Sequence, residues 1–105
     1  MLKKLLGIAP KLESDGSYSP SKLALKLATV QKTDFENISY QKYEGKKSKI
    51  LVIFTEEKNL KMQNGKLFST GNHPVEALLP MLHLKNAGFD FEIATPTGKP
   101  VVFEM

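Results

Sequence analysis

The sequence predicts an α/β fold built from one strand–helix–strand unit, and three observations support this class. Residues 50–54 form an unbroken apolar run, Ile-Leu-Val-Ile-Phe, which is typical of a parallel-sheet strand covered on both faces. Residues 74–88 carry apolar side chains at helical spacing, and residues 89–94 alternate between apolar and polar side chains as a strand does. Parallel strands joined by a helix belong to sandwiches in which helices cover both faces of the sheet. Two strands do not complete such a sandwich, so we expect this unit to be part of a larger fold.

The first 46 residues predict an arm rather than a second layer of long helices. Residues 1–18 show no sustained period. Ser19-Pro20 predicts a helix start, with serine as the cap and proline at the first helical position, and a short helix is expected near residues 20–29. The rest of the arm is polar and is expected to be irregular. The domain interpretation is therefore an arm over residues 1–46 and a partial α/β domain over residues 47–105.

The predicted helix of the α/β unit has signals at both ends and a disturbance within it. Its apolar stripe consists of Val75, Leu78, Leu79 and Leu82. Asn72 is a candidate cap, Pro74 suits the first turn, and Gly88 suits a left-handed stop. Pro80 has no N–H for the carbonyl of Glu76, so a kink is expected at a cost of about 3 kcal/mol relative to a good helix former. The kink could tilt the Glu76 carboxylate toward the sheet or merely bend the helix around the core, and the proline alone does not separate these readings.

The connection over residues 55–73 is long for a βαβ unit, where about 2–6 residues are usual. It contains the turn signal Asn64-Gly65. Connections of this length are functional loops or carry small elements of their own. This one also leaves the carboxyl end of a strand, which is where α/β folds place ligands.

The composition excludes several kinds of site. The sequence has no cysteine, so these residues cannot supply a disulfide, a thiolate metal site or a cysteine nucleophile. The net charge is +4, but every basic residue is a lysine, and lysine lacks the planar fork with which arginine reads guanine and grips phosphate. The densest basic patch, residues 42–49, is interpreted as a solvated approach to a strand, and no specific nucleic-acid partner is expected.

The amino terminus weakly resembles a secretory leader. Its apolar stretch, residues 5–9, is shorter than the roughly 7–15 residues of a signal sequence, and no run reaches the roughly 20 residues of a membrane-spanning helix. A cytoplasmic location without membrane contact is the expectation.

The stretch from Asn64-Gly65-Lys66 to Asn72-His73-Pro74 is long and unusual. Together with the flanking sequence over roughly residues 47–104, and more weakly the arm from Ser19 onward, it is similar to the HchA-type chaperones and glyoxalases of the PfpI-like superfamily. The resemblance implies a flavodoxin-like three-layer sandwich, of which this chain supplies a first βαβ unit. It also implies a holdase chaperone that converts methylglyoxal to lactate without glutathione and acts as a protein deglycase. The implied partners are small reactive carbonyl compounds, unfolded proteins and a second copy of the chain, and no cofactor is expected.

The resemblance also assigns roles to individual residues. Glu76 falls on a catalytic glutamate that assists a cysteine nucleophile and a histidine, both of which lie farther along the family's sequence than this chain extends. A carboxyl beside a thiol can exchange a proton with it and then shuttle protons on the bound carbonyl compound. The family's first two metal ligands fall on Lys85 and Asp90. Because a protonated lysine has no lone pair, Asp90 is at most a weak metal ligand.

Each of these residues also has a structural interpretation. Carboxylates are favoured in the first turn of a helix by its dipole, which would explain Glu76 without catalysis. His73 and His83 are interpreted as packing or hydrogen-bonding residues rather than ligands.

Three functions are open at this point. The first is a fragment of the enzyme, from a truncated, split or cleaved protein, that is inactive alone because it has no cysteine. The second is a chaperone-like binding protein that uses exposed apolar faces of the βαβ unit. The third is a non-functional truncated product.

Overall fold

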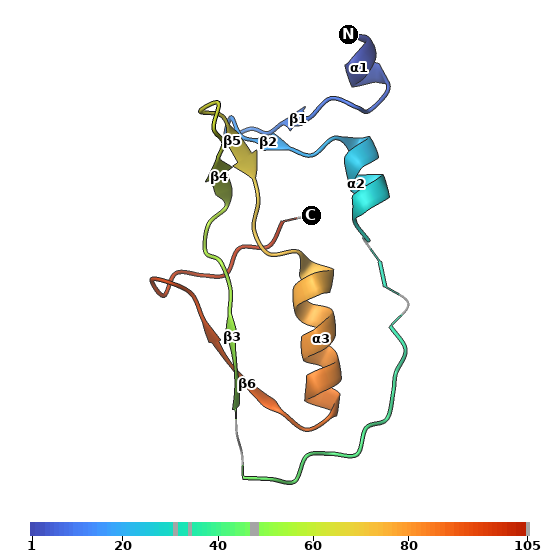
Figure 1. The fold of residues 1–105 in the computed structure, drawn as a ribbon, viewed down its shortest axis with the longest axis vertical. Helices are drawn as coiled ribbons and strands as arrows, with labels where there is room; N and C mark the ends of the chain where they lie inside the picture. The colour runs from blue at the N-terminus through green and yellow to red at the C-terminus, as the bar shows by residue number, and fades with distance from the viewer. Residues whose placement is uncertain (31, 34, 47–48, 105) are drawn as a thin grey trace.

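The computed structural model describes residues 1–30, 32–33, 35–46 and 49–104, and it arranges them as two small sheets and three helices (Figure 1). The elements in chain order are α1 (Leu2–Leu5), β1 (Lys11–Leu12), β2 (Tyr18–Ser19), α2 (Lys22–Ala28), β3 (Lys49–Ile53), β4 (Asn59–Lys61), β5 (Leu67–Ser69), α3 (Pro74–Asn86) and β6 (Asp90–Ala94). The predicted α/β class is confirmed.

The strand–helix–strand unit consists of β3, α3 and β6. The two strands pair in parallel, with Lys49 opposite Asp90 at one end and Ile53 opposite Ala94 at the other. Figure 1 shows α3 running alongside this pair. The apolar run and the alternating segment therefore form the strands that the sequence predicts, each within one residue of its expected bounds.

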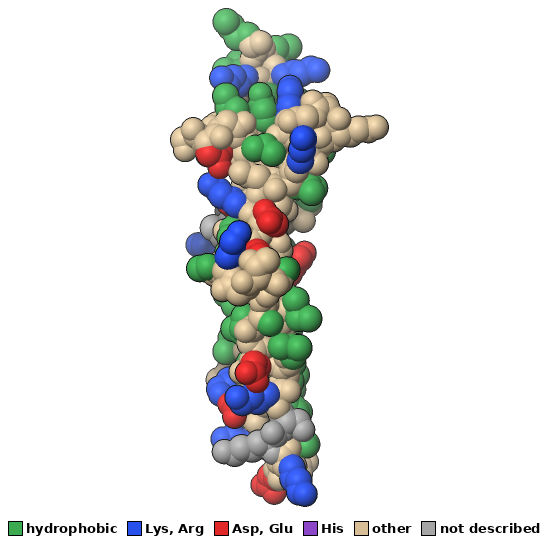
Figure 2. Space-filling model, turned by 90° about the vertical axis from the view of Figure 1, so that its left-hand side faces the viewer, with side chains coloured by type: hydrophobic (Ala, Val, Ile, Leu, Met, Phe, Trp, Pro, Cys, Tyr) green, Lys and Arg blue, Asp and Glu red, His purple; other side chains and the backbone are tan. Residues whose placement is uncertain are grey.

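One face of the β3–β6 sheet is uncovered. Ile50 and Val52 are half-buried, but Leu51 and Ile53, which point to the opposite face, are 60% and 70% exposed. Phe54, just after β3, is the only buried hydrophobic side chain among the described residues. The described residues include only one long helix, α3, so they cover one face of this strand and leave the other open, as expected from the lack of a second long helix in the arm. Figure 2 shows hydrophobic side chains at the surface along much of the length of the molecule.

Helix α3 begins and ends close to its predicted bounds. Pro74 occupies the first turn, and Gly88, which follows the helix, has a φ angle of +93°. The N-cap, however, is His73, whose side chain makes no capping bond, so the prediction that Asn72 caps the helix is wrong. The helix continues through Pro80 to Asn86.

The apolar side chains of α3 are not confined to one stripe. None of the helix residues is buried, and leucines on different sides are exposed, among them Leu78, Leu82 and Leu84. A helix that is apolar on several sides is typical of the interior of a larger protein. The helix therefore presents more apolar surface than the described residues cover.

The second sheet combines the arm with the long connection. Its strand order is β1-β2-β5-β4, and β2 pairs in parallel with β5 through Tyr18 and Phe68. Strands β4 and β5 form an antiparallel hairpin around Asn64-Gly65. The expectation that the long connection carries small elements of its own is confirmed, whereas strands β1 and β2 were not predicted.

The short helix of the arm, α2, starts later than predicted. Its N-cap is Ser21, whose hydroxyl accepts a hydrogen bond from the Ala24 amide at 3.1 Å. Ser19 instead lies in β2, opposite Lys11. Pairing of Ser19 in the sheet competes with the cap role, so the helix begins after the next serine.

The remainder of the arm crosses beside α3 without regular structure over residues 35–46, as expected. The Tyr43 amide donates to the Ala87 carbonyl at 2.8 Å, and the Tyr43 ring stacks on Phe89 with centroids 4.8 Å apart. The predicted domain boundary at residue 47, and part of the basic patch over residues 42–49, lie outside the described residues.

The molecule is elongated, with principal extents of 58 × 34 × 20 Å. Its radius of gyration is 17.8 Å, whereas a compact domain of this length has about 13 Å.

Candidate functional site

The carboxyl end of β3 meets the amino end of α3 at a junction held by Asn72. The Asn72 side-chain amide donates to the carbonyls of Thr55 at 2.9 Å and Val102 at 2.8 Å, and its carbonyl accepts from the Thr55 amide at 3.3 Å. The Asn72 backbone adds a bond from its amide to the Val102 carbonyl and another from the Glu104 amide to its own carbonyl. One side chain thus ties together three segments that are far apart in sequence.

The residue before Asn72 permits this close approach. Gly71 has a φ angle of +132°, a conformation that is essentially restricted to glycine. A Cβ atom on Gly71 would lie 3.0 Å from Glu104 Cγ and 3.1 Å from the Val102 carbonyl oxygen. The backbone of the carboxyl-terminal segment therefore runs so close to Gly71 that a Cβ there would be tightly packed.

Glu76, the predicted catalytic residue, lies in the first turn of α3, directly after this junction. It is exposed to solvent. The structure therefore places the carboxylate at the strand end where α/β proteins bind ligands, but the described residues do not enclose it. The catalytic role of Glu76 stays a prediction.

His73 borders a small groove between the arm and the junction. The groove has a volume of about 150 Å³ and is lined by Ser19, Pro20, Leu25, Thr29, Phe68, Ser69, Thr70, Gly71, His73 and Glu104. The Nδ1 atom of His73 is buried and has no hydrogen-bond partner among the described residues. His73 is therefore a lining residue at the edge of the junction.

Glu56 links the two segments that follow the parallel strands β3 and β6. Its carboxylate accepts hydrogen bonds from the Thr97 hydroxyl at 2.5 Å, the Thr97 amide at 3.1 Å and the Lys99 amide at 3.3 Å. The Thr97 hydroxyl, followed by that residue's amide, keeps the pKa of Glu56 below its usual range. Through these hydrogen bonds, the carboxylate holds the turn after β6 against the segment that follows β3.

Lys85 and Asp90, the residues at the implied metal positions, form an ion pair with Nζ and Oδ1 2.7 Å apart. Ligation of a metal by Asp90 would compete with this pair. No group of three or more His, Cys, Asp or Glu side chains suited to a metal is found in the part of the chain that the structure describes. The residues present do not fit a metal centre, and the Asp90 assignment stays a weak prediction.

His83 holds the arm against α3. Its Nδ1 atom lies 2.8 Å from the Tyr40 hydroxyl, and its ring centroid lies 4.8 Å from that of Phe35. These contacts agree with the structural interpretation of His83.

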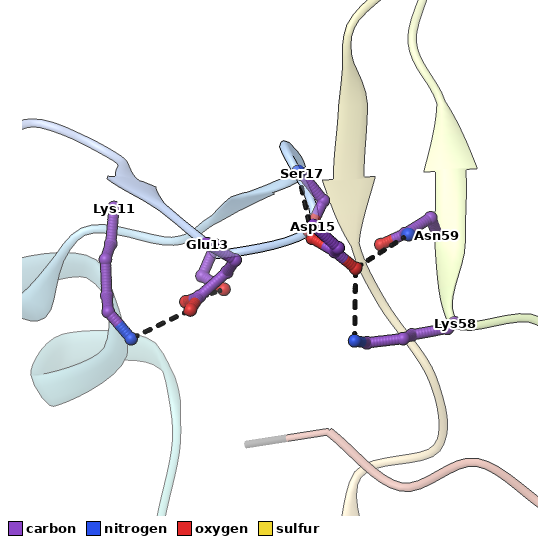
Figure 3. A network of polar contacts seen from close by, with 7 residues as sticks. Lys11, Glu13, Asp15, Ser17, Lys58 and Asn59 are labelled. Atoms are coloured by element: carbon purple, nitrogen blue, oxygen red, sulfur yellow. Dashed lines mark hydrogen bonds and ion pairs between the residues drawn. The ribbon is translucent and has the colours of Figure 1, made fainter.

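A network of polar contacts joins the arm to the hairpin of the long connection (Figure 3). Asp15 accepts from the Ser17 hydroxyl at 2.6 Å and from the Ser17 amide at 3.0 Å, and its second oxygen contacts Lys58 at 3.1 Å and Asn59 at 3.4 Å. The hydrogen bonds from Ser17, and then those from Lys58 and Asn59, hold the pKa of the Asp15 carboxyl far below its usual range.

Neighbouring Glu13 extends this network along the arm. It accepts from the Ser19 hydroxyl at 2.7 Å and pairs with Lys11 at 2.9 Å. These two partners, Ser19 first, lower the pKa of Glu13. The network fixes the arm relative to the junction through β5.

Comparison with known proteins shows which sequences this chain is similar to. No protein-family model matches the sequence. The chain is, however, 50% identical over 97 residues to the protein/nucleic acid deglycase HchA of Pseudomonas aeruginosa strain LESB58. It is 45% identical, over the same length, to the protein/nucleic acid deglycase HchA of Staphylococcus aureus strain JH9. Over the matched residues, the chain is similar to these HchA deglycases.

The similarity to HchA covers nearly all of this chain but only part of each relative. The alignments include 91% of the chain and 33% of the relatives, so the chain spans about a third of the length of the curated relatives it matches. The similarity therefore includes much of the arm as well as residues 47–104, in agreement with the weaker resemblance predicted from Ser19 onward.

Gly71 and Asn72 are the residues of the junction whose structural roles sequence reasoning missed. Both belong to the unusual segment that carries the HchA resemblance, which was the available signal. The asparagine was interpreted as a helix cap because its acceptors and donors at residues 55 and 102 are not visible in local sequence.

None of the helices in the described ranges is long and apolar enough to cross a membrane.

Proposed function

We propose that this chain forms one part of an HchA-type deglycase and glutathione-independent glyoxalase, and that it has no turnover by itself. The similarity to two deglycases named HchA, at 45–50% identity over 97 residues, is the observation that carries the proposal. The absence of cysteine supports the proposed lack of turnover, because the family chemistry uses a thiol that these residues cannot supply.

Within that function, Glu76 is the residue that this chain contributes to the reaction. Its place in the first turn of α3, beside the Asn72 junction, suits a carboxylate that exchanges a proton with a nearby thiol and later moves protons on the bound carbonyl compound. Glu76 is exposed here, so the proposal requires further protein to enclose it. In this view the arm over residues 1–46 and the partial domain over residues 47–105 are two portions of one larger fold.

The proposed substrates are a small reactive carbonyl compound such as methylglyoxal and the adducts that such compounds form. The relatives carry the name protein/nucleic acid deglycase, which supports adducts on macromolecules. An adduct on a nucleic acid can be recognised without reading the base sequence. This agrees with the basic residues of the chain, which are all lysine and lack the planar group with which arginine contacts bases.

The first test is methylglyoxal consumption by the purified chain, with lactate detected and no glutathione added. We expect no turnover above the buffer rate. Turnover that survives repurification and is lost in Glu76→Gln would contradict the proposal, because it would require chemistry without a thiol.

A second candidate function is chaperone-like binding of unfolded proteins, favoured by the exposed apolar side chains of β3 and α3. A specific holdase would suppress aggregation of a heat-treated client at stoichiometric ratio while remaining monodisperse. A chain that co-aggregates with the client, as followed by light scattering, would rule this candidate out.

A further inference from the structure

Residues 1–30 carry most of the net charge of the chain. They contain five lysines and two acidic residues, a net charge of +3, whereas residues 31–105 contain ten lysines and nine acidic residues, a net charge of +1. Both acidic residues of this segment are paired, Glu13 with Lys11 at 2.9 Å and Asp15 with Lys58 at 3.1 Å. Among the described residues, no ion pair is found for the other lysines of the segment, which are Lys3, Lys4, Lys22 and Lys26.

The same segment exposes leucines on its two short helices. In α1, Leu2, Leu5 and Leu6 are spaced at i, i+3 and i+4, so they share one face, and they are 69%, 84% and 58% exposed. In α2, Leu23 and Leu27 are spaced at i and i+4 and are exposed as well. Neither helix contains a buried residue. These leucines therefore add nothing to the core of the described molecule.

The two helices lie together at one end of the molecule. The Leu23 amide donates to the Gly7 carbonyl at 3.1 Å, which links α2 to the turn after α1. Figure 1 shows α1 at the tip of the long axis and α2 close to it, whereas the turn between α3 and β6 lies toward the other end. On the face that Figure 2 shows, this tip carries hydrophobic and lysine side chains and no acidic ones. Below, "the lysine–leucine end" means Lys3, Lys4, Lys22, Lys26, Leu2, Leu5, Leu6, Leu23 and Leu27.

The combination of exposed leucines and exposed lysines discriminates between partners. A layer of packed protein that covered the leucines would also take lysines out of water, which is costly unless acidic groups meet them. A second copy of this end would bring like charges together. At the surface of an anionic bilayer, by contrast, leucines enter the boundary of the acyl chains while lysines reach the headgroup phosphates on their flexible stems.

The use of lysine alone fits the same partner. Attraction to anionic lipid depends on the number of positive charges near the surface and not on the geometry of each contact. A mobile point charge is sufficient for this attraction, and the planar fork of arginine is not needed. The lysines that are unsuited to reading bases are therefore well suited to a lipid surface.

We propose that the lysine–leucine end binds the surface of an anionic phospholipid bilayer. The sequence predicted no membrane contact because it offers neither a leader nor a span of sufficient length, but binding in the plane of the interface requires neither of them. This inference goes beyond the proposed function and does not depend on it.

The experiment measures co-sedimentation of the purified chain with vesicles. One set contains phosphatidylcholine with about 30% phosphatidylglycerol, and the other contains phosphatidylcholine alone. We expect the chain to bind the anionic vesicles at least about tenfold more tightly than the neutral ones. Raising the salt concentration from about 0.05 M to about 0.5 M should weaken this binding, because salt screens the attraction.

Two double variants test the two kinds of side chain. Lys3→Gln with Lys4→Gln should weaken binding to anionic vesicles about tenfold or more. Leu2→Gln with Leu5→Gln leaves the charge and the helix propensity nearly unchanged, and we expect it to weaken binding at least about fivefold. Because α1 buries no residue, neither pair of substitutions removes a core contact.

The matched control removes two charges elsewhere. Lys42 lies beside Gly88 after α3, and Lys99 follows β6. Both are exposed. We expect Lys42→Gln with Lys99→Gln to change vesicle binding by less than about twofold, since charges farther from the bilayer than the Debye length are screened.

Three outcomes would overturn the proposal. The first is no binding, or equal binding to the anionic and neutral vesicles. The second is an equal loss of binding in the control and in Lys3→Gln with Lys4→Gln, which would assign the attraction to net charge alone. The third is binding that Leu2→Gln with Leu5→Gln leaves unchanged and that duplex DNA of random sequence competes away, which would indicate a general affinity for polyanions.

Discussion

At the scale of single residues, Asn72 shows that one polar side chain can hold together segments that are far apart in sequence. Its amide group makes three hydrogen bonds to the backbone of residues 55 and 102, and its own backbone makes two more. Helix-capping rules favoured asparagine before a helix, but they consider only neighbours in sequence. The acceptors that Asn72 uses lie 17 and 30 residues away, so local reasoning could not find them.

Substituting Asn72→Ala should loosen the junction. We expect a loss of about 1–3 kcal/mol of local stability, because the substitution leaves part-buried backbone groups without partners. Hydrogen exchange of the Thr55 amide should accelerate, since this amide donates to the Asn72 side chain. The control Asn37→Ala, in an exposed irregular segment, should leave that rate unchanged. Equal exchange rates in the two variants would show that Asn72 does not hold the strand end.

The depressed pKa of Asp15 predicts that docking of the arm depends on pH. Its pKa is depressed in the folded chain, so its contribution to stability is present above the unfolded value, about 3.9 for an ordinary Asp, and is lost as pH falls further through the folded value. We therefore expect acid unfolding of the β1–β2–β5–β4 sheet below about pH 4 to be less pH-dependent in Asp15→Asn. The midpoint of urea unfolding, followed from pH 6 to pH 2, measures this.

The control for Asp15 is Glu44→Gln, which changes the net charge equally at an exposed arm position outside the network. Identical pH profiles for Asp15→Asn and the unaltered chain would mean that the Asp15 contacts do not stabilise the arm.

At the scale of elements, the long strands and the long helix were predicted well because each has a clear apolar pattern. β3 is an unbroken apolar run, and α3 and β6 repeat an apolar pattern over enough residues to be recognised. Strands β1, β2, β4 and β5 contain two or three residues each, which is too short for any period to show. Their existence depends on pairing between the arm and the long connection, and such pairing is not local.

The same limit applies to the candidate site. The position of Glu76 in the first turn of α3 followed from the sequence, as did the ambiguity of its role. The ion pair of Lys85 with Asp90 and the arm contacts of His83 required the three-dimensional arrangement. The cysteine of the proposed reaction is outside these residues, so neither sequence nor structure of this chain could complete the site.

The connection from β5 to α3 offers a test of element packing. Gly71→Ala should destabilise this connection by more than about 1 kcal/mol, because alanine disfavours its backbone conformation and its Cβ would press on Val102 and Glu104. Gly65→Ala is the matched comparison: Gly65 also has a positive φ angle, +78°, but no atom lies within 4 Å of the added Cβ.

We expect Gly65→Ala to carry only the conformational cost, about 1 kcal/mol, and to affect only the β4–β5 hairpin. Amide exchange at Asn72, which donates to Val102, distinguishes the two variants. An unchanged exchange rate in Gly71→Ala would refute the close packing of the carboxyl-terminal segment on Gly71.

At the scale of the whole molecule, the dominant feature is the scarcity of buried apolar surface. Phe54 is the only buried hydrophobic residue described, whereas Leu51, Ile53, Leu78 and Ile93 of the βαβ unit are between 49% and 70% exposed. Burial of apolar side chains is the main favourable contribution to folding. We therefore expect the βαβ unit to be only marginally stable while these side chains are uncovered.

This shape leads to a direct prediction for the isolated chain. Small-angle scattering of the monomer should give a radius of gyration near 17.8 Å or larger, rather than the roughly 13 Å of a compact domain of this length. The chain should also bind a hydrophobic dye, and added sulfate should promote its self-association. A compact monomer that binds no dye would show that these residues can cover their own apolar surface.

The junction at Asn72 also has a consequence for the order of events during synthesis. Val102, one of its two anchors, is translated 30 residues after Asn72. At about 5–20 residues per second, the nascent chain waits roughly 1.5–6 s between making the asparagine and making the last partner of its side chain. For that interval the start of α3 has no attachment to the carboxyl-terminal segment. Slow codons between these two positions would lengthen the period in which ribosome-associated chaperones meet an unanchored helix.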